Sequence, residues 1–254
     1  MKPKIELNSN AISLRRKFGI DDHSKVDVFE LINSITNLTL VFYPLQDKIS
    51  GMSSKVTDKQ KLLVINSTHT YGRQRFTASH ELYHQYFQPN FRSVICSSDL
   101  DGEKDEEEQN ADAFASYFLA PYDALNNYIL FELEKVKGEN IVLSDIVNIE
   151  QHFGISRGAT IYRLIGEGYL PYPCPDEYKN QIIQSAKNFG YDIDLYVPLP
   201  EEKQYGTSGS YLNLAKELFD NDKISDGKYE SYLLDAFRSD IVYNLNPESR
   251  KADD

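Results

Sequence analysis

Apolar and polar residues alternate along this chain in patterns that predict both strands and helices. Apolar runs at Leu38–Phe42 and Lys61–Ile65 predict strands, Ile49–Ser53 is a candidate third strand, and Asp58-Lys59-Gln60 has the composition of a turn. Longer segments of helical periodicity surround and follow them. We therefore expect an α+β fold, in which a small mixed or antiparallel sheet carries an active-site helix and the C-terminal half is mostly helical.

Helical periodicity is clearest from Tyr71 to Phe87 and from about Asp105 to Leu119, which Pro89 and Pro121 bring to an end. Ser144 is placed to cap a helix over residues 145–152, and a tight turn at 154–156 leads into another helix over 157–166. Further helices are predicted over 11–18, 26–35 and 122–136, and around 177–188, 210–220 and 225–242.

These elements suggest two units. Residues 1–170 form the first, which ends in a helix-turn-helix-like pair at about 141–170. The proline-rich stretch Pro171–Pro175 reads as a linker, and residues 176–254 form a helical C-terminal extension of unknown role.

Composition narrows the class of protein. Of the 254 residues, 41% are hydrophobic and 26% are charged, which is ordinary for a globular protein. No run of about 18 apolar residues and no signal-like N-terminus is present, so we expect a cytoplasmic protein without a membrane partner. Cys96 and Cys174 read as reduced, unpaired thiols, and nothing in the sequence brings either one near the histidines discussed below.

Acidic residues outnumber basic ones, and half of the excess lies in one segment. The net charge is −12, and residues 101–112 hold seven acids and one lysine, a net charge of −6. Such a balance argues against a protein whose main task is binding nucleic acid. The run leads directly into the helix of residues 105–119, so its last members have a defined position on that helix.

The stretch His80-Glu81-Leu82-Tyr83-His84 is the strongest chemical signal. Residues four apart lie on one face of a helix, so the two imidazoles can reach a single metal ion. Glu81 lies next to the first histidine and can reach a water molecule on that ion. Two histidines also arise at this spacing by chance on a helix surface, but chance does not explain the acidic residues downstream.

A catalytic zinc ion usually has three protein ligands, so a third is needed. Glu108 has Asp112 four residues later on the same helical face, and one carboxylate can bind metal while the other accepts a hydrogen bond from a ligating imidazole. Glu106 and Glu107 compete for the ligand role. The remaining histidines are candidates only if the fold brings them close: His23, His69 and His152.

At this point the chain resembles the ImmA/IrrE-type metallo-endopeptidases. The similarity is carried by the segments Arg75–His84 and Glu108–Ala115 and by the closing Leu119-Ala120-Pro121. It extends over roughly residues 10–170, through Leu14-Arg15, Gly19-Ile20, Ile49-Ser50-Gly51, Phe153-Gly154-Ile155-Ser156 and Arg163-Leu164. Tyr83, Asn110 and Ala120 differ from residues that are frequent in the family at these places.

The resemblance implies that His80, His84 and Glu108 hold the metal and that Glu81 is the general base and later the general acid. Zinc is the default ion for such ligands, and Mn²⁺ or Fe²⁺ would accept the same set. A metal lowers the pKa of a bound water enough for a carboxylate to take its proton at neutral pH. Tyr83 and Tyr117 are candidates for stabilising an oxyanion or for lining the cleft, and a packing role is their ordinary alternative.

The family resemblance also implies a protein substrate. Its members typically cleave a helix-turn-helix repressor or an antitoxin, which relieves repression of a mobile element or a stress response. The acidic surface would suit a basic DNA-binding partner. The alternative is an antirepressor or toxin–antitoxin component that acts by binding. Direct nucleic-acid binding by residues 144–167 is disfavoured, because Arg157 and Arg163 are balanced there by acids.

Overall fold

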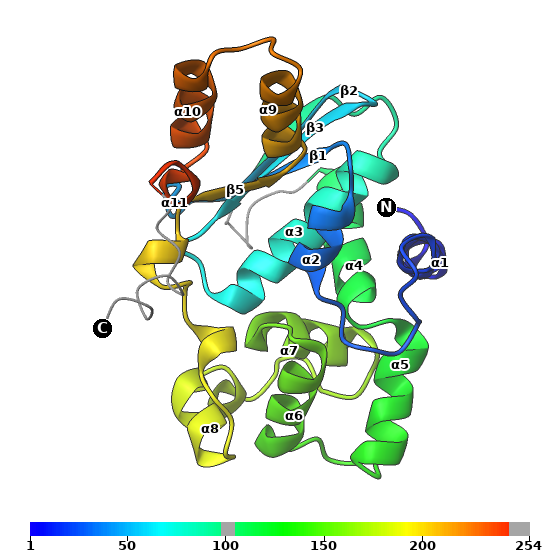
Figure 1. Ribbon diagram of the computed structural model, residues 1–254. Helices are drawn as coiled ribbons and strands as arrows, with labels where there is room; N and C mark the ends of the chain where they lie inside the picture. Colours follow the sequence, from blue (N-terminus) through cyan, green and yellow to red (C-terminus); the bar gives the residue numbers. More distant parts are fainter. Residues whose placement is uncertain (98–104, 244–254) are drawn as a thin grey trace, which may run out of the picture.

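A mixed sheet forms the centre of the protein in a computed structural model that describes residues 1–97 and 105–243 (Figure 1). Its five strands lie in the order β4-β2-β3-β1-β5. β1 and β3 are parallel, whereas the other neighbouring pairs are antiparallel. The strands are β1 (Leu38–Tyr43), β2 (Ile49–Thr57), β3 (Gln60–Asn66), β4 (Ser93–Ser97) and β5 (Gly206–Gly209). The sheet and the helices around it confirm the predicted α+β class.

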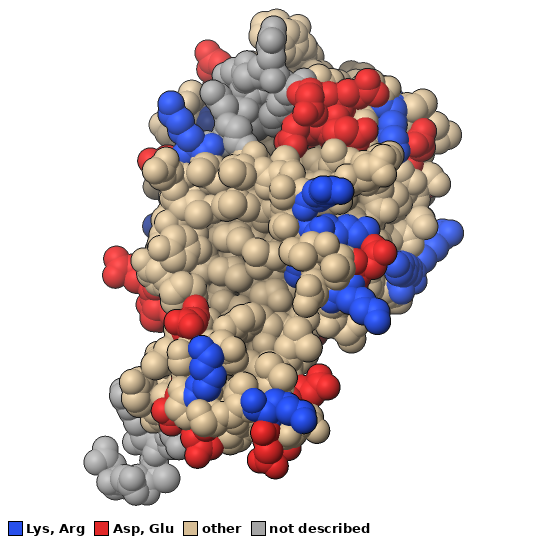
Figure 2. Space-filling model, turned by 90° about the horizontal axis from the view of Figure 1, so that it is seen from above, with Lys and Arg blue, Asp and Glu red and all other residues tan. Residues whose placement is uncertain are grey.

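Helices bury one face of the sheet, whereas the other face has exposed apolar residues. Alternate residues of β1 and β3, such as Leu40, Leu63 and Ile65, are buried beneath helix α3 (Tyr71–Tyr86), so this face contributes to the main core. The opposite face leaves Leu62 and Ile95 exposed by 37% and 61%. Seen from above, the molecule has a hollowed and largely uncharged region at its centre (Figure 2).

The first half of the chain places its helices around α3. α1 (Lys4–Lys17) packs against α4 (Glu106–Leu119), which in turn packs against α3, and α2 (Val28–Ser34) contacts α3 and β1. α1 begins earlier than the predicted helix at 11–18. The predicted helix at 122–136 is shorter, since α5 (Tyr122–Asn127) runs into the π-helix η1 (Tyr128–Glu132).

Close contact between α3 and the sheet depends on one glycine. A Cβ atom added to Gly51 of β2 would lie 2.7 Å from Thr77 Cγ2 and 2.8 Å from the carbonyl oxygen of Val64. Further along α3, the side-chain amide of Gln85 donates to Ser53 Oγ of β2 at 2.6 Å. These contacts determine how closely α3 packs against the sheet.

The helix-turn-helix-like pair consists of α6 (Leu143–Phe153) and α7 (Arg157–Gly166). Ser144 lies inside α6 and does not cap it, because the helix starts one residue earlier and the Asp145 carboxylate accepts the N–H of Val142 at 2.9 Å. The turn is joined to α3 by Arg75, whose buried guanidinium donates to the carbonyl oxygens of Gly154 and Val26 at 2.8 and 2.7 Å.

The two arginines of α7 point into the protein. Arg157 forms a buried ion pair with Glu150 and donates to Ser185 Oγ at 2.9 Å. Arg163 pairs with Glu167 at 3.0 Å and is 4% exposed. Both guanidinium groups therefore contribute to packing, and their burial leaves neither exposed to bind a nucleic-acid phosphate.

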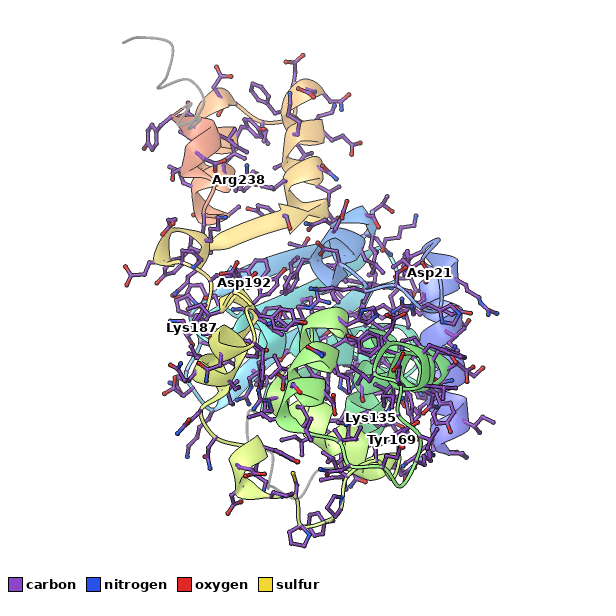
Figure 3. The ribbon with its side chains drawn as sticks, turned by 90° about the horizontal axis from the view of Figure 1, so that it is seen from below. Asp21, Lys135, Tyr169, Lys187, Asp192 and Arg238 are labelled. Carbon is purple, nitrogen blue, oxygen red and sulfur yellow. The ribbon has the colours of Figure 1, made fainter. Side chains whose placement is uncertain are left out.

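The chain after the proline-rich stretch returns to the sheet. Its short helices η2 (Asp176–Tyr178), α8 (Ile182–Asn188), η3 (Asp194–Tyr196) and η4 (Glu201–Lys203) lead to β5, which pairs with β1. α9 (Ser210–Asp220), α10 (Asp226–Asp235) and α11 (Ser239–Val242) then form a lobe, marked by Arg238 in Figure 3, at the opposite end of the molecule from Lys135 and Tyr169. The proposed division of the chain near residue 175 stays a prediction.

The predicted C-terminal helices are partly wrong in their bounds. The segment 177–188 is interrupted near Gln181, and 225–242 is interrupted near Phe237, because both residues adopt positive φ angles, of 49° and 59°. None of the helices in the described residues is long and apolar enough to cross a membrane. Residues 101–104 of the acidic run and the acidic end at Asp253 and Asp254 lie outside the described residues.

Candidate metal centre

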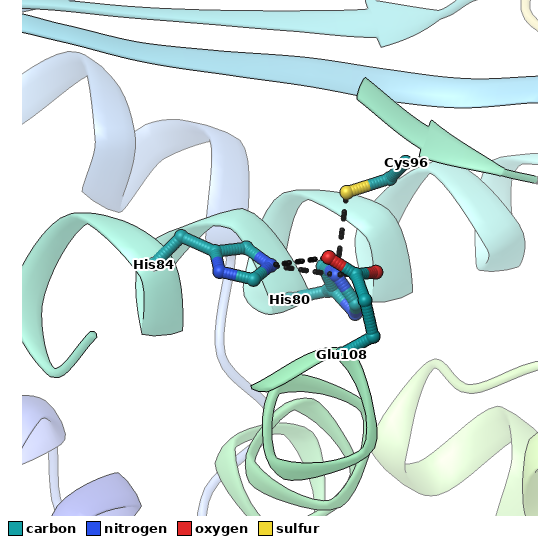
Figure 4. Close-up of side chains that lie close together, drawn as sticks. All are labelled: His80, His84, Cys96 and Glu108. Atoms are coloured by element: carbon teal, nitrogen blue, oxygen red, sulfur yellow. Dashed lines mark hydrogen bonds and ion pairs between the residues drawn. The ribbon is translucent and has the colours of Figure 1, made fainter. Parts of the chain in front are cut away.

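Three elements bring four potential metal donors to one point between the sheet and the helices. α3 supplies His80 and His84, one helical turn apart, the first turn of α4 supplies Glu108, and edge strand β4 supplies Cys96 (Figure 4). One donor atom from each residue lies within 4.8 Å of the others. Asp105 fixes the start of α4 by accepting the backbone N–H of Glu108 at 2.9 Å.

The hydrogen bonds of the two imidazoles determine which nitrogen atoms face the centre. His80 Nδ1 lies 2.9 Å from Asp112 Oδ1, and His84 Nδ1 lies 2.6 Å from Gln88 Oε1. A carboxylate oxygen and an amide oxygen only accept, so both Nδ1 atoms carry hydrogen and both Nε2 lone pairs are directed at the centre. Asp112 thus takes the position expected for a residue that orients a ligating imidazole.

The donor atoms converge closely enough to require positive charge between them. The two Nε2 atoms are 3.0 Å apart, and Cys96 Sγ lies 3.3 Å from His80 Nε2. The Glu108 oxygens lie 3.3 Å from His80 Nε2 and 3.4 Å from His84 Nε2. Lone pairs at these distances repel unless protons or a metal ion lie among them.

These separations fit a tetrahedral ion. In a zinc site with bonds of about 2.0 to 2.3 Å, neighbouring donor atoms lie about 3.3 to 3.6 Å apart. The observed distances of 3.0 to 3.4 Å are close to that range. Nitrogen, carboxylate and thiolate donors are also the set that zinc prefers. The residues present therefore fit a divalent ion of this kind.

Glu81 lies beside the four donors, in contact with Cys96 and His80. It is fully buried, and neither of its carboxylate oxygens has a hydrogen-bond partner in the described part of the chain. Burial raises the pKa of this carboxyl, although the neighbouring His80 and Cys96 lower it. A buried carboxylate without partners is costly, so Glu81 is a candidate for a chemical role beside these donors.

The neighbouring acids of α4 are engaged elsewhere, and this separates Glu108 from its competitors. Glu106 pairs with the N-terminal amino group at 2.9 Å. Glu107 accepts the hydroxyl hydrogen of Tyr83 at 2.7 Å. Burial raises the pKa of the Glu108 carboxyl, but contacts with His80 and His84 outweigh burial and hold this pKa well below its usual range. The structure thus brings Glu108, and neither of its two neighbours, to the histidines.

The two candidate tyrosines have partners outside the four-donor cluster. The Tyr83 hydroxyl is bound to Glu107, as described above, and its ring packs against Phe114. The Tyr117 hydroxyl lies 3.4 Å from Glu167, and its ring lies below the guanidinium of Arg163. An oxyanion role for either one stays a prediction, and these hydrogen bonds favour packing.

The remaining histidines do not join the cluster. His69 Nε2 lies 3.3 Å from the carbonyl oxygen of Asp47, and the ring of His152 packs against Tyr128 with 4.1 Å between the centroids. His23 lies in an exposed loop, where its backbone N–H donates to Asp21. None of the three is grouped with His80 and His84 among the described residues.

Cys96 is a correction to the sequence-based expectation. Its thiol was expected to be remote from the metal site, yet its Sγ atom faces His80 and is 97% buried, since the residue is 3% exposed. Burial raises the pKa of this thiol to about 12, although its contact with His80 lowers it. The signal that could have found it is the short run Ser93–Ser97, if that run is recognised as a strand pairing with β2 beside Gly51.

The four donors lie within a segment that matches a known protein family. A family model described as the IrrE N-terminal-like domain of the M78 peptidases matches residues 35–165, just over half of the 254 residues. The match includes both histidines, Glu81, Cys96 and Glu108. A search of curated proteins gives no match. The chain therefore belongs to the ImmA/IrrE-type family of M78 metallopeptidases.

Proposed function

We propose that this protein is a metal-dependent endopeptidase that cleaves a specific regulatory protein in the cytoplasm. The observation that carries the proposal is the buried, unpartnered carboxylate of Glu81 beside converging donors from His80, His84 and Glu108. Zinc is the ion that this donor set favours, and Mn²⁺ or Fe²⁺ would accept it.

Each residue has a distinct task in the proposed reaction. His80, His84 and Glu108 would hold the ion, and Asp112 keeps the His80 ring oriented through its Nδ1 hydrogen bond. When bound, the ion supplies Lewis-acid polarisation of the peptide carbonyl and lowers the pKa of water. Glu81 takes a proton from the attacking water at a carboxylate oxygen and returns it to the amine of the departing product. Its burial keeps competing solvent away from that oxygen.

The proposed substrate is a helix-turn-helix repressor or an antitoxin that controls a mobile element or a stress response. This part of the proposal rests on the family to which the chain belongs and on the net charge of −12, which favours association with a basic DNA-binding protein. Cleavage of such a partner should weaken as salt is added, because screening reduces the attraction between opposite charges.

Exchange of Glu81 for Gln tests the reaction directly. The variant should retain its metal and lose at least about 100-fold in turnover, since the amide cannot accept the proton. New protein N-termini would be compared in host cells making wild type, Glu81→Gln or Glu106→Gln, with and without DNA damage. One or a few cuts that need Glu81 but not Glu106 would identify both activity and substrate.

The alternative function is an antirepressor or toxin–antitoxin component that acts by binding, with a structural metal. One observation favours it: the cluster contains four protein donors, as closed structural zinc sites do. If Glu81→Gln abolishes no cleavage event and leaves the biological effect intact, the endopeptidase proposal is wrong and the binding function is preferred.

A further inference from the structure

Cys96 gives the centre one more donor than the proposed reaction uses. Three protein ligands and one open position are typical of catalytic zinc, whereas four protein ligands close the site. Cys96 Sγ lies 3.3 Å from His80 Nε2, and its donor atom belongs to the same group, within 4.8 Å, as those of His84 and Glu108. The thiol therefore stands where a water molecule would have to bind.

A second feature directs Cys96 to this place. β4 pairs with β2 in antiparallel register, and the register shifts between Ile49 and Gly51, directly opposite Cys96. Such irregularities re-aim side chains and are frequent beside active sites. The fully buried, unpartnered carboxylate of Glu81 lies beside the same donors, so the arrangement fits an ion among them and not the thiol alone.

We propose that Cys96 is a fourth metal ligand that closes the centre, so that the folded protein is a latent peptidase until the thiolate leaves. This inference rests on the proposed function. It also reconciles a closed donor set with a retained general base, because Glu81 would have no use in a site that never opens.

Departure of Cys96 is feasible because of where β4 lies in the sheet. β4 is an edge strand of five residues and is paired in the described structure only with β2, whereas α3 is buried along most of its length. A small movement of β4 would withdraw the thiol while His80 and His84 stay in place. The thiolate would take up one proton from solvent and a water molecule would replace it, so no oxidant or reductant is needed.

The ligand assignment can be tested without any activity measurement. The full chain would be loaded with Co²⁺ in place of zinc, and its absorption spectrum examined for a thiolate-to-cobalt charge-transfer band. Wild type and Cys174→Ala should show the band, and Cys96→Ala should lack it while still binding cobalt. Cys174 is a matched control, since it is the other cysteine and is also buried, with its thiol next to the carbonyl oxygen of Pro175.

Absence of the band in wild type would overturn the assignment, whatever the variants do. This measurement needs only the wild-type chain, so it decides the question even if Cys96→Ala does not fold.

Latency is tested with zinc-loaded protein and quenched-fluorescent casein as the probe. Cys96→Ala should raise turnover by about tenfold or more, because a minor open state is typically populated at no more than about 10%. The gain should disappear in the double variant with Glu81→Gln, and Cys174→Ala should match wild type. Equal or lower turnover in a folded, zinc-containing Cys96→Ala protein would overturn latency. A thiolate band with no Glu81-dependent turnover of casein in any form would overturn latency and leave the ligand assignment, while the comparison of protein N-termini decides the peptidase function.

Discussion

Two hydrogen-bond acceptors determine the ring orientation and the tautomer of His80 and His84. Asp112 and Gln88 each accept from an Nδ1 atom, and as a result both Nε2 lone pairs are available to a metal. The two acceptors are not equivalent. Asp112 carries charge and comes from α4, whereas Gln88 is neutral and follows α3 directly. Asp112 therefore also couples the position of His80 to that of α4.

Exchange of Asp112 for Ala should lower zinc affinity by about 10- to 100-fold, because loss of the acceptor frees the His80 ring to turn and to change tautomer. Competition with a zinc-binding dye would measure the effect. Glu106→Gln is the matched control, since Glu106 is on the same helix and its carboxylate pairs with the N-terminal amino group, away from the two histidines. Unchanged affinity in Asp112→Ala would show that the hydrogen bond does not orient the ligand.

At the residue scale, helical spacing explains what could be predicted. The i, i+4 relations of His80 with His84 and of Glu108 with Asp112 place each pair on one helical face, and the structure brings the four together. Cys96 could not be predicted in this way. Its approach to His80 depends on pairing between β4 and β2, and no local spacing relates a strand residue to a helix 16 positions earlier.

At the scale of the elements, the contact between α3 and β2 depends on one glycine. Gly51 allows β2 to approach α3, and the space that its missing Cβ leaves is bordered by Thr77 Cγ2 and, 3.5 Å away, by Glu81 Oε1. The position of the Glu81 carboxylate therefore depends on the same close contact that holds the helix against the sheet.

Exchange of Gly51 for Ala should lower the free energy of unfolding by about 1 to 3 kcal/mol, because the added methyl group meets a backbone carbonyl that cannot move freely. Gly158→Ala should have the opposite effect on stability. Gly158 lies within α7 with open space around it, and Ala favours a helix more than Gly does, so the free energy of unfolding should rise by about 0.5 to 1 kcal/mol. Urea denaturation of the two variants measures both effects. Equal effects of the two substitutions would contradict the steric explanation.

The elements that were not predicted from the sequence are short or lack apolar residues. β5 has the sequence Gly-Thr-Ser-Gly and is held by backbone pairing with β1, for which no side-chain pattern exists. β4 has five residues, of which two are serines. The longer apolar strands β1 and β3 and the helices α3 and α4 were predicted, because burial against a core imposes a period on their residues.

On the scale of the whole molecule, the C-terminal extension completes a buried polar network. Glu150 of α6 pairs with Arg157 of α7 and accepts the hydroxyl hydrogen of Tyr196 at 2.8 Å. Arg157 also donates to the carbonyl oxygen of Tyr178 at 2.8 Å. Burial raises the pKa of Glu150, and the contact with Arg157 lowers it. The extension thus satisfies polar groups of the preceding helix pair.

Zinc should stabilise the entire fold, since its donors come from three elements of the core. At a free zinc concentration about 1,000 times its dissociation constant, the gain is about 4 kcal/mol. Burial lowers the pKa of His80, but contacts with Asp112, Cys96 and Glu108 outweigh burial and raise this pKa well above its usual value of 6.5. Protons therefore compete with zinc, and the stabilisation is lost as the pH falls through this raised pKa.

The melting temperature with zinc, minus that with a chelator, would measure this competition at about pH 8 and about pH 6. The difference should be larger at the higher pH. An equal difference at both pH values would mean that protons do not occupy the centre when the metal leaves.

The pairing of β5 with β1 has a consequence for how the protein is made. β1 ends at Tyr43, but its outer neighbour is complete only when Gly209 has been synthesised. At a synthesis rate of about 5 to 20 residues per second, that edge stays uncovered on the ribosome for roughly 8 to 30 seconds. All the metal donors emerge during this interval, beside an edge that can recruit strands from other nascent chains. β5 therefore covers the edge of β1 only after all four donor residues have been synthesised.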